Sequence, residues 1–253
     1  MQKIPKIIHY CWFGGNPKPQ LVLNCIESWK KYCPDFEIRE WNEQSFDINA
    51  VQYVKEAYEA KKWAFVSDYV RLYALNKFGG VYLDTDVQLY KPIDIFLTDD
   101  MFWGFESRDF VMTAIFGSKP GHVMLGRYIA EYNEKHFVKE DGSFDMLPNP
   151  YVITKRLAEK GLKLNGKKQV VEDFTVYPQI FFNPNNFARI WDKPSRKSFA
   201  VHHCDQSWRN RKQKSSFGYR VRRFLVGIMR NAFGTYKIVR FRKQIGDLLK
   251  KKR

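Results

Sequence analysis

Cysteine and long apolar runs are scarce in this chain of 253 residues. It has four cysteines, with no CxxC pair and no zinc-like spacing among them. A bridge between Cys25 and Cys33 stays open, but reduced thiols in a cytosolic chain are the simpler interpretation. The longest apolar run near the carboxyl end, Phe224 to Met229, is far shorter than the ~20 residues that span a bilayer. Since no signal-peptide pattern begins the sequence either, we expect a soluble or surface-bound protein.

Net charge is almost absent from most of the chain, although the total is +16. Residues 209–253 carry sixteen Lys or Arg against one acid, whereas residues 1–208 carry 27 basic and 26 acidic side chains. A high positive charge is typical of nucleic-acid binding, but here it belongs to a tail and not to the body. We therefore expect a nearly neutral domain, 1–208, followed by a basic helical tail, 209–253.

The order of apolar patterns indicates an α/β domain. Strand patterns at 6–13, 36–41 and 81–83 alternate with helical patterns at 21–32, 47–62 and 64–78, the last of which ends on two glycines. Further on, we expect strands at 101–105, 110–116, 170–178 and 198–203, and helices at 121–135 and 151–160. The alternation in the first hundred residues favours one compact α/β domain with a largely parallel sheet.

Two carboxylates follow the apolar strand pattern that ends at Leu83. Asp84 and Asp86 are two residues apart, so their side chains point to the same side of a strand or of its exit. Two carboxylates at one point repel each other unless a cation lies between them, and oxygen ligands suit Mg²⁺ or Mn²⁺. The carboxyl end of such a strand is also where ligands bind in α/β sheets. The alternative is that the pair only begins a loop.

The helix before this strand contains a second charged pair. Asp68 and Arg71 are three residues apart, so they share one face of the helix. An intrahelical ion pair is one interpretation. In the other, both residues lie at the edge of the sheet, where Arg71 faces phosphate or ribose and Asp68 accepts from hydroxyl groups.

Three blocks of sequence surround these residues. Residues 4–15 read IPKIIHYCWFGG, residues 67–75 read SDYVRLYAL, and residues 78–87 read FGGVYLDTDV. In this order the blocks resemble the glycosyltransferases of family 32, which carry the DXD sugar-binding motif. That family includes yeast initiating mannosyltransferases and many bacterial capsule enzymes. The similarity extends to His202-His203 and Ser207-Trp208, and so covers about residues 4–208.

This resemblance implies a GT-A fold, with a Rossmann-like mixed sheet flanked by helices, a nucleotide-sugar donor, Mn²⁺ or Mg²⁺, and retention of the anomeric configuration. In the related clostridial glucosylating toxins, the tryptophan that matches Trp12 stacks on uracil, which favours a UDP-sugar. Asp68 and Arg71 match residues that contact the sugar and ribose. Asp86 matches the direct metal ligand, and Asp84 matches the residue that contacts ribose and the donor sugar.

The last block of the resemblance is less specific. Retaining GT-A enzymes often place a histidine from this region on the metal, which gives His202 or His203 that role. Only one of two successive strand residues faces a site, and we favour His202 slightly over His203. Ser207 and Trp208 match positions near the metal and the diphosphate. The alternative for the histidines is packing on an apolar strand.

Four further polar residues carry a weaker signal. Glu106, Arg108 and Asp109 follow a strand pattern, so they could reach the acceptor or the sugar, or form a solvated loop. We assign Glu106 to catalysis. His9 lies inside a strand pattern, and we expect a core residue with satisfied hydrogen bonds there.

The basic tail has two amphipathic stretches. Apolar residues recur at helical spacing, first as Phe217, Val221, Phe224, Leu225, Ile228 and Ala232, and then as Ile238, Phe241, Ile245, Leu248 and Leu249. Basic residues flank both stripes, as in helices that lie on anionic membrane surfaces. The alternative is a terminal helix packed on the domain. Nucleic-acid binding is not expected, because the body shows no recognised binding motif.

The sequence therefore predicts a retaining, metal-dependent hexosyltransferase. It would use a nucleotide-sugar to extend a glycan or polyprenyl-linked saccharide in surface (capsular) polysaccharide synthesis, at the cytoplasmic face of the membrane. One rival is a haloacid-dehalogenase-like phosphatase, in which an apolar strand also ends in Asp-x-Asp. The other is a basic membrane- or RNA-binding module. The donor sugar, the acceptor and the route of retention stay open.

Overall fold

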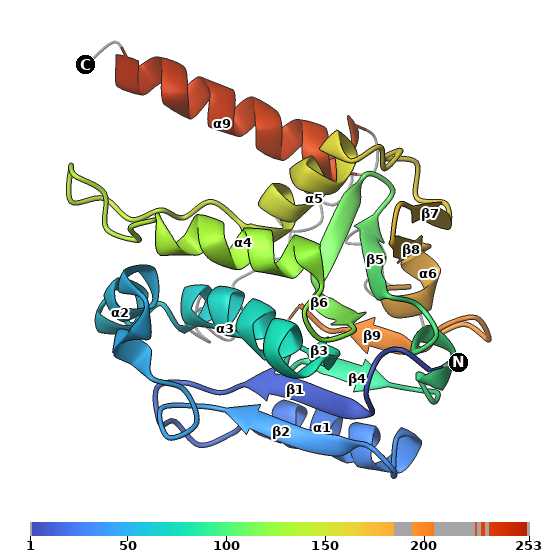
Figure 1. Ribbon diagram of the computed structural model, residues 1–253. Helices are drawn as coiled ribbons and strands as arrows, with labels where there is room; N and C mark the ends of the chain where they lie inside the picture. Colours follow the sequence, from blue (N-terminus) through green and yellow to red (C-terminus); the bar gives the residue numbers. More distant parts are fainter. Residues whose placement is uncertain (1, 185–193, 205–225, 227–228, 231–232, 252–253) are drawn as a thin grey trace.

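The computed structural model describes residues 2–184, 194–204, 226, 229–230 and 233–251, with the backbone alone for 245–251. Within this part of the chain, one sheet has the strand order β2-β1-β3-β6-β5-β8-β7, and β4 and β9 form a second sheet (Figure 1). The strands are β1 (Ile7–Cys11), β2 (Glu37–Trp41), β3 (Gly80–Leu83), β4 (Val87–Leu89), β5 (Met101–Ser107), β6 (Phe110–Ser118), β7 (Gln169–Val171), β8 (Phe174–Tyr177) and β9 (Ala200–His202).

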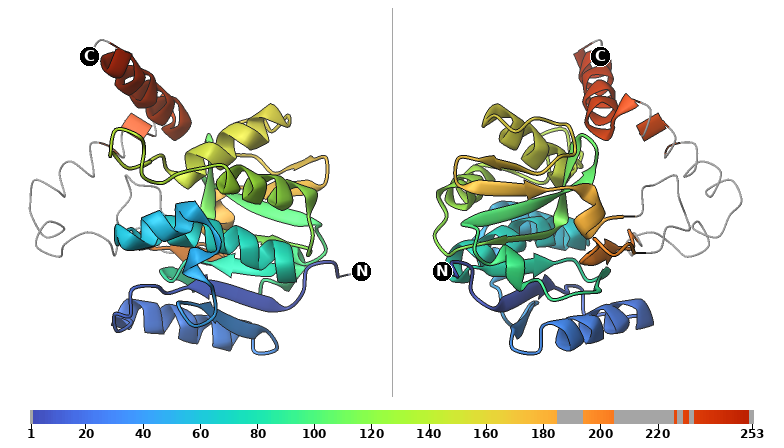
Figure 2. Two further views of the ribbon diagram at one scale, coloured as in Figure 1. Left: turned by 60° about the vertical axis from the view of Figure 1, so that its left-hand side comes forward. Right: turned by 90° about the vertical axis from the view of Figure 1, so that its right-hand side faces the viewer.

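Helices lie on both faces of the large sheet. The helices in the described part of the chain are α1 (Gln20–Tyr32), α2 (Gln52–Glu59), α3 (Trp63–Phe78), α4 (Val123–Asn133), α5 (Asn149–Glu159), α6 (Gln179–Phe182) and α9 (Thr235–Lys251), with 3₁₀ turns at Ile48–Ala50 and Asp94–Phe96. Helices α2 to α5 contribute to one hydrophobic core, and α1 with the small β4–β9 sheet contributes to another. Figure 2 shows these layers from two further sides.

The strand pairing is mixed. β1 is parallel to both β2 and β3, so the parallel pairing expected for the first hundred residues is present. β6 is antiparallel to its neighbours β3 and β5, whereas β5 and β8 are parallel. The predicted α/β class, with a mixed sheet flanked by helices, is confirmed. This is the arrangement that the resemblance to GT-A glycosyltransferases implied.

Strand alternation divides the core between the two faces of the sheet. In β3, Val81 and Leu83 pack into the core with α1, whereas Tyr82 packs into the core with α3. In β5, Trp103 faces the α3 side and stacks on Phe116 of β6 with ring centroids 4.2 Å apart. Because both faces of these strands are buried, they read as apolar runs without polar alternation.

The two glycines between α3 and β3 make a tight turn that delivers β3 to the middle of the sheet. Gly79 and Gly80 have φ of 66° and 106°, which only glycine adopts readily. A Cβ on Gly80 would also lie 2.5 Å from the carbonyl oxygen of Ile7. The predicted helix end at these glycines is confirmed, and the turn brings β3 beside β1.

Two expected elements are divided in the structure. The helix expected at 47–62 is a 3₁₀ turn and the separate helix α2, because Val51 between them has extended dihedral angles. The strand expected at 170–178 is the hairpin of β7 and β8, which turns at Glu172 with φ of 50°. The short strand β4 was not foreseen.

The tail is described in part. Helix α9 corresponds to the second amphipathic stretch, and most of the first stretch lies outside the described residues. Among the helices of the described part, none is long and apolar enough to cross a membrane.

Candidate functional site

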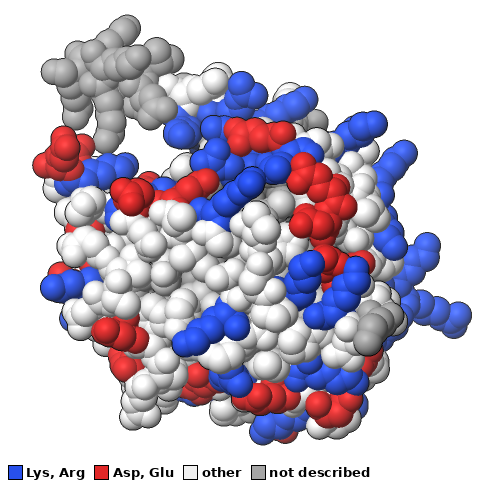
Figure 3. Space-filling view, in the orientation of Figure 1, with Lys and Arg blue, Asp and Glu red and all other residues white. Residues whose placement is uncertain are grey.

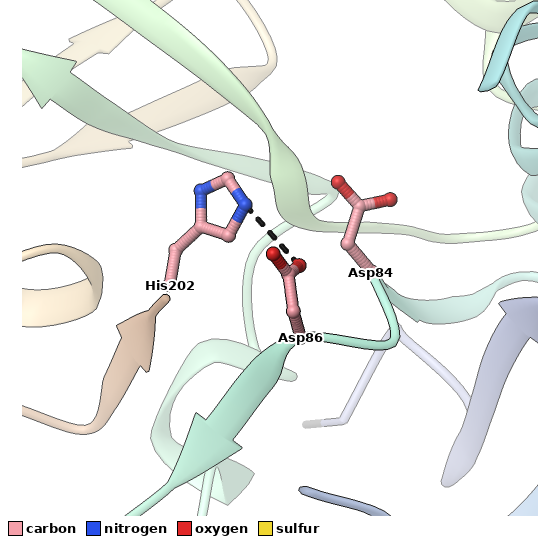
Figure 4. Close-up of side chains that lie close together, drawn as sticks. All are labelled: Asp84, Asp86 and His202. Atoms are coloured by element: carbon pink, nitrogen blue, oxygen red, sulfur yellow. Dashed lines mark ion pairs between the residues drawn. The ribbon is translucent and has the colours of Figure 1, made fainter. Parts of the chain in front are cut away.

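Asp84 and Asp86 lie in the turn that leads from β3 of the large sheet to β4 of the small sheet (Figure 4). The Asp84 N–H donates to the carbonyl of Ala114 in β6 at 2.7 Å, and the Val87 N–H donates back to the Asp84 carbonyl at 2.9 Å. These two bonds fix the turn. The carboxylates lie close together as expected, although a turn and not strand alternation brings them there.

His202 joins the acidic pair from β9. β9 runs antiparallel to β4 with His202 opposite Val87, the residue that follows Asp86. The His202 Nε2 lies 3.3 Å from Asp86 Oδ1. One ligand atom from each of Asp84, Asp86 and His202 lies within 4.8 Å of the other two, and Figure 4 shows the three side chains around one point.

The neighbouring histidine has a different environment. The backbone N–H of His203 donates to the carbonyl of Asp86 at 3.0 Å, and its Nε2 lies 3.0 Å from the Gln88 side-chain oxygen. Strand alternation therefore turns His202, and not His203, toward the acidic pair.

His202 is held at both ring nitrogens. Its Nδ1 lies 3.4 Å from the sulfur of Cys204, and its Nε2 faces Asp86. Burial lowers the pKa of the imidazole, but Cys204 and the Asp86 carboxylate raise that pKa well above its ordinary value. The raised pKa favours a protonated imidazole beside the Asp86 carboxylate. A metal ion must displace this proton, because only the neutral imidazole is a ligand.

Arg71 ties the acidic turn to helix α3. Its Nη2 lies 3.1 Å from Asp68 Oδ1 and 3.4 Å from Asp84 Oδ1, and the side chain is almost fully buried. Its Nη1 donates to the carbonyl of Thr113 in β6 at 2.7 Å, and the guanidinium lies 4.7 Å from the ring centroid of Tyr82. The intrahelical Asp68–Arg71 pair is thus present, and it is also part of the acidic cluster. A contact between Arg71 and phosphate stays a prediction.

Asp68 is supported by a residue that the sequence did not single out. Asn149, the first residue of α5, is buried and donates its side-chain N–H to Asp68 Oδ1 at 3.3 Å. Burial raises the pKa of Asp68 to about 6, Asp84 adds to this rise, and Arg71 and Asn149 oppose it. No local sequence signal marks Asn149, because its partner lies 81 residues away.

Trp12 follows the carboxyl end of β1. Because β1 and β3 are parallel, the ends of both strands lie at one edge of the sheet, near the acidic turn. The Trp12 indole N–H donates to the carbonyl of Asn16 at 2.6 Å, and the Lys18 ammonium lies 5.9 Å from the ring centroid. The ring is partly exposed. Its contact with a base stays a prediction.

Glu106 is the second-last residue of β5, and its carboxyl group interacts electrostatically with Asp84 and His202. Burial raises the pKa of its carboxyl group, and the nearby Asp84 acts in the same direction, whereas His202 and Arg230 oppose the rise. Glu106 therefore senses the charges of the acidic turn and of its histidine.

The other polar residues of the 106–109 segment differ from Glu106. Arg108 is exposed, as a solvated loop would have it. The solvated-loop interpretation is wrong for Asp109, which is buried with 8 % of its surface exposed. The Asp109 carboxylate accepts from the N–H groups of Thr235 and Tyr236 at the start of α9. Ser207 and Trp208, predicted near the diphosphate, lie outside the described residues.

His9 is a core residue, as predicted. It is fully buried, its Nδ1 accepts from the Trp41 indole N–H at 3.1 Å, and its Nε2 lies 2.8 Å from the Gly79 carbonyl. Both ring nitrogens are thereby satisfied in the neutral form.

Comparison with known proteins places part of this site within a family match. Residues 19–103 match the model of a family described as the glycosyltransferase sugar-binding region containing the DXD motif. The match contains Asp68, Arg71, Asp84 and Asp86. It does not reach His202, which the fold brings to the same point.

Two curated relatives come from Schizosaccharomyces pombe. Inositol phosphoceramide mannosyltransferase 3 is 28% identical over 130 residues, which are 48% of this chain and 35% of the relative. Inositol phosphoceramide mannosyltransferase 1 is 27% identical over 160 residues, which are 55% of this chain and 47% of the relative. The chain thus spans less than half the length of each of these relatives.

Solved structures with a distant likeness are also glycosyltransferases by their titles. PaToxG glycosyltransferase has a TM-score of 0.46 and 18% identity, covering 62% of this chain and 69% of its own. A glycosyltransferase involved in the glycosylation of the major capsid of PBCV-1 has a TM-score of 0.47 and 13% identity, covering 89% and 100%.

Proposed function

The chain carries a glycosyltransferase sugar-binding region of the family-32 type, and from this premise we propose that it is a retaining, metal-dependent hexosyltransferase. The donor is a nucleotide-sugar, and the comparison of Trp12 with the toxins favours a UDP-sugar. The observation that carries the proposal is the convergence of Asp84, Asp86 and His202, next to the buried Arg71. A phosphatase would need the same acidic pair. This pair lies within the region that matches the glycosyltransferase model, so a phosphatase is disfavoured.

The chemistry of the three side chains fits a divalent cation. Two carboxylates suit Mg²⁺ or Mn²⁺, and an imidazole is a softer ligand that favours Mn²⁺. Asp86 and His202 would hold the ion directly, with Asp84 beside them. Bound there, the cation supplies positive charge for the diphosphate that leaves from the donor.

The residues of the chain divide the remaining work. Trp12 presents its ring to the base, and Asp84 and Asp68 accept from hydroxyl groups of the ribose and sugar. Arg71 holds these two carboxylates in place through one guanidinium, and it adds a fixed positive charge near the diphosphate. Ser207 and Trp208 complete the diphosphate site in the proposal.

Transfer forms one bond and breaks one bond at the anomeric carbon. The acceptor hydroxyl oxygen bonds to this carbon on the face from which the diphosphate leaves, and the C–O bond to the diphosphate breaks. The hydroxyl proton passes to the leaving diphosphate or to water. Glu106 lies within the electrostatic reach of Asp84 and His202, so we assign it to the acceptor side of the site.

The acceptor in this proposal is a glycan or a saccharide on a polyprenyl lipid, in the synthesis of surface or capsular polysaccharide. Residues 209–253 would hold the enzyme on an anionic membrane surface, on the cytoplasmic side. The names of the two yeast relatives describe mannosyl transfer to a lipid, which supports a lipid-linked acceptor.

A donor hydrolysis panel tests the proposal. The chain is incubated with UDP-glucose, UDP-galactose, UDP-N-acetylglucosamine and GDP-mannose, with Mn²⁺ or with a chelator, and with a phosphomonoester as the comparison. We expect slow hydrolysis of at least one nucleotide-sugar only with Mn²⁺, and none of the phosphomonoester. If no nucleotide-sugar is hydrolysed or shifts the melting temperature in the presence of Mn²⁺, the proposal is wrong.

A further inference from the structure

The start of helix α9 is joined to the body of the domain by one carboxylate. Asp109 lies in the tight turn between β5 and β6, 126 residues before its partner in the sequence. Its Oδ1 accepts from the Thr235 N–H at 2.7 Å, and its Oδ2 accepts from the Tyr236 N–H at 3.2 Å. The first N–H groups of a helix have no partner within the helix, so Asp109 caps α9 from a distant part of the chain.

The residues around the Asp109 cap pack closely against it and form further contacts between α9 and the domain. Gly234 precedes α9 with φ of 85°, and a Cβ at this position would lie 2.2 Å from Asp109 Oδ2. The Ser107 hydroxyl and the Thr235 hydroxyl are hydrogen-bonded at 2.9 Å, and both residues are buried. Tyr236 stacks on Tyr151 of α5, with ring centroids 5.3 Å apart. We call these contacts the α9 joint: Ser107, Asp109, Tyr151, Gly234, Thr235 and Tyr236.

The joint lies beside the site. Ser107 follows Glu106 on β5, and β5 pairs with β6, whose Thr113 and Ala114 carbonyls accept from Arg71 and Asp84 of the site. Just before the joint, the Gly234 N–H donates to the Arg230 carbonyl at 2.9 Å. The positive charge of Arg230 opposes the rise in the pKa of Glu106. The base of α9 therefore lies on the side of the site to which Glu106 belongs.

Beyond the joint, α9 stands away from the sheet. Figures 1 and 2 show it at the end of the molecule where α5 lies, with its carboxyl end beyond the body. Residues 237–244 contain Lys237, Arg240, Arg242 and Lys243 and no acid, and these four are exposed. Phe241 among them is 62% exposed, and Phe233 just before the joint is 65% exposed. In Figure 3, Lys and Arg side chains lie along this end of the molecule, with Asp and Glu side chains among them.

We propose that α9 is an arm that binds an anionic lipid bilayer and that the Asp109 cap holds this arm, already helical, beside the acceptor side of the site. The inference rests on the proposed function, in which the acceptor is lipid-linked. A bilayer bound to α9 would bring such an acceptor to Glu106. Exposed aromatic side chains interleaved with basic ones complement an anionic, apolar surface. Each basic residue near such a surface contributes on the order of 1 kcal/mol to binding.

The cap and simple electrostatics predict opposite signs for one variant. If charge alone mattered, Asp109→Ala would bind anionic vesicles more tightly, because it removes a negative charge. If the cap organises the arm, the same variant binds less tightly, about fivefold, since the loss of an acidic cap destabilises a helix start. Gly234→Ala changes no charge but displaces Asp109, so it weakens binding too. The matched control is Glu27→Ala, which removes an exposed acid whose ion pair with Lys30 lies on α1.

The experiment measures binding of the full chain to phosphatidylcholine vesicles with and without phosphatidylglycerol. We expect the wild-type chain and Glu27→Ala to bind the anionic vesicles equally well, or Glu27→Ala slightly better. Asp109→Ala and Gly234→Ala should bind about fivefold more weakly. Hydrogen exchange at the Thr235 and Tyr236 amides should be slow in the wild type and fast in Asp109→Ala. Melting curves check that each variant is folded.

Three results overturn the inference. The first is a wild-type chain that ignores anionic vesicles, and the second is tighter binding of an oligonucleotide of equal charge. The third is an Asp109→Ala variant that binds vesicles as tightly as Glu27→Ala while its Thr235 amide stays protected. Hydrolysis of the nucleotide-sugar is measured on the same samples. A chain that binds vesicles through the joint but hydrolyses no donor contradicts the proposed function alone.

Discussion

The Nη2 atom of Arg71 lies between two carboxylates, 3.1 Å from Asp68 and 3.4 Å from Asp84. The same guanidinium donates to Thr113 of β6, so one side chain joins helix α3, strand β6 and the acidic turn. A lysine has one nitrogen and cannot reach these partners together, because only the guanidinium presents donors in a planar fork.

Arg71→Lys should therefore impair both stability and activity. Asp68 would lose its partner in an almost fully buried ion pair, and breaking such a pair costs about 3–5 kcal/mol. We expect a free energy of unfolding lower by about this amount in a denaturant titration, and donor hydrolysis reduced about 100-fold. The control is Arg39→Lys, because Arg39 forms a more exposed ion pair with Glu37. This variant should change neither the free energy of unfolding nor donor hydrolysis much. Normal stability of Arg71→Lys would contradict the role of the fork.

Asp86→Ala should abolish turnover of the donor while the fold stays intact. Asp86 and His202 are partly exposed, so the loss of the Asp86 carboxylate should not unfold the domain. The loss also relieves the repulsion between Asp86 and Asp84. We expect loss of Mn²⁺ binding by calorimetry and a loss of hydrolysis of about 100-fold or more, as for removal of a key electrostatic group.

His202→Ala and His203→Ala form a matched pair for the same site. His202→Ala should weaken Mn²⁺ binding and hydrolysis. His203→Ala should leave both near normal, because the His203 ring faces Gln88. Equal losses in the two variants would mean that the histidine effect is structural and does not arise from the metal.

Much of this site was visible in the sequence because its residues stand in short blocks. Asp84 and Asp86 end a strand pattern, and Asp68 and Arg71 share one helical turn, so local spacing predicted both pairs. His202 followed from the resemblance, and its preference over His203 gained a reason only from the pairing of β9 with β4. The helix end at Gly79 was predictable because a positive φ selects glycine.

Contacts between distant segments could not be predicted in this way. Asn149 supports Asp68, and Asp109 caps α9, and in each case the partner lies far away in the sequence. Asp109 in a polar turn looks like a solvated residue until the return of the chain at Thr235 is known. The break at Val51 and the turn at Glu172 were missed because neither residue is a glycine or proline.

Acid should destabilise the domain through His9. Burial lowers the pKa of His9 to about 4, whereas an unfolded histidine titrates near 6.5. The unfolded chain therefore binds more protons than the folded chain between these pH values. The contribution of His9 to the free energy of unfolding is full above about pH 6.5 and is lost as the pH falls toward 4. The full difference is about 3 kcal/mol. Structurally, a proton on Nδ1 would face the Trp41 N–H that now donates to it.

His9→Gln should remove most of this dependence, although the variant is less stable at neutral pH. Asp68 acts in the opposite direction, since its raised pKa of about 6 makes the folded state bind more protons between about pH 4 and 6. The measurement is therefore the difference between the wild type and His9→Gln in urea titrations from pH 7.5 to 4. A difference that is constant across this range would contradict the assignment.

Trp12 should set the affinity for the donor and its preference among bases. The ring lies at the sheet edge next to the acidic turn, and its orientation is fixed by the bond from its indole N–H to Asn16. Stacking of a base on an aromatic side chain contributes about 1–3 kcal/mol. Trp12→Ala should thus raise KM for the nucleotide-sugar about 10- to 100-fold with a smaller change in kcat. Trp12→Phe keeps a ring without the N–H and should recover part of the affinity.

The control for this effect is Phe144→Ala, since Phe144 is an exposed aromatic residue that stacks on Phe137 and is not assigned to the donor. Inhibition by free UDP, GDP and CDP, measured on the wild type and on Trp12→Ala, shows whether the base is the group that Trp12 contacts. We expect the tryptophan to increase the affinity for a nucleoside diphosphate but not for inorganic pyrophosphate. An equal loss of affinity for pyrophosphate in Trp12→Ala would mean that the substitution disturbs the metal and diphosphate site and that the base lies elsewhere.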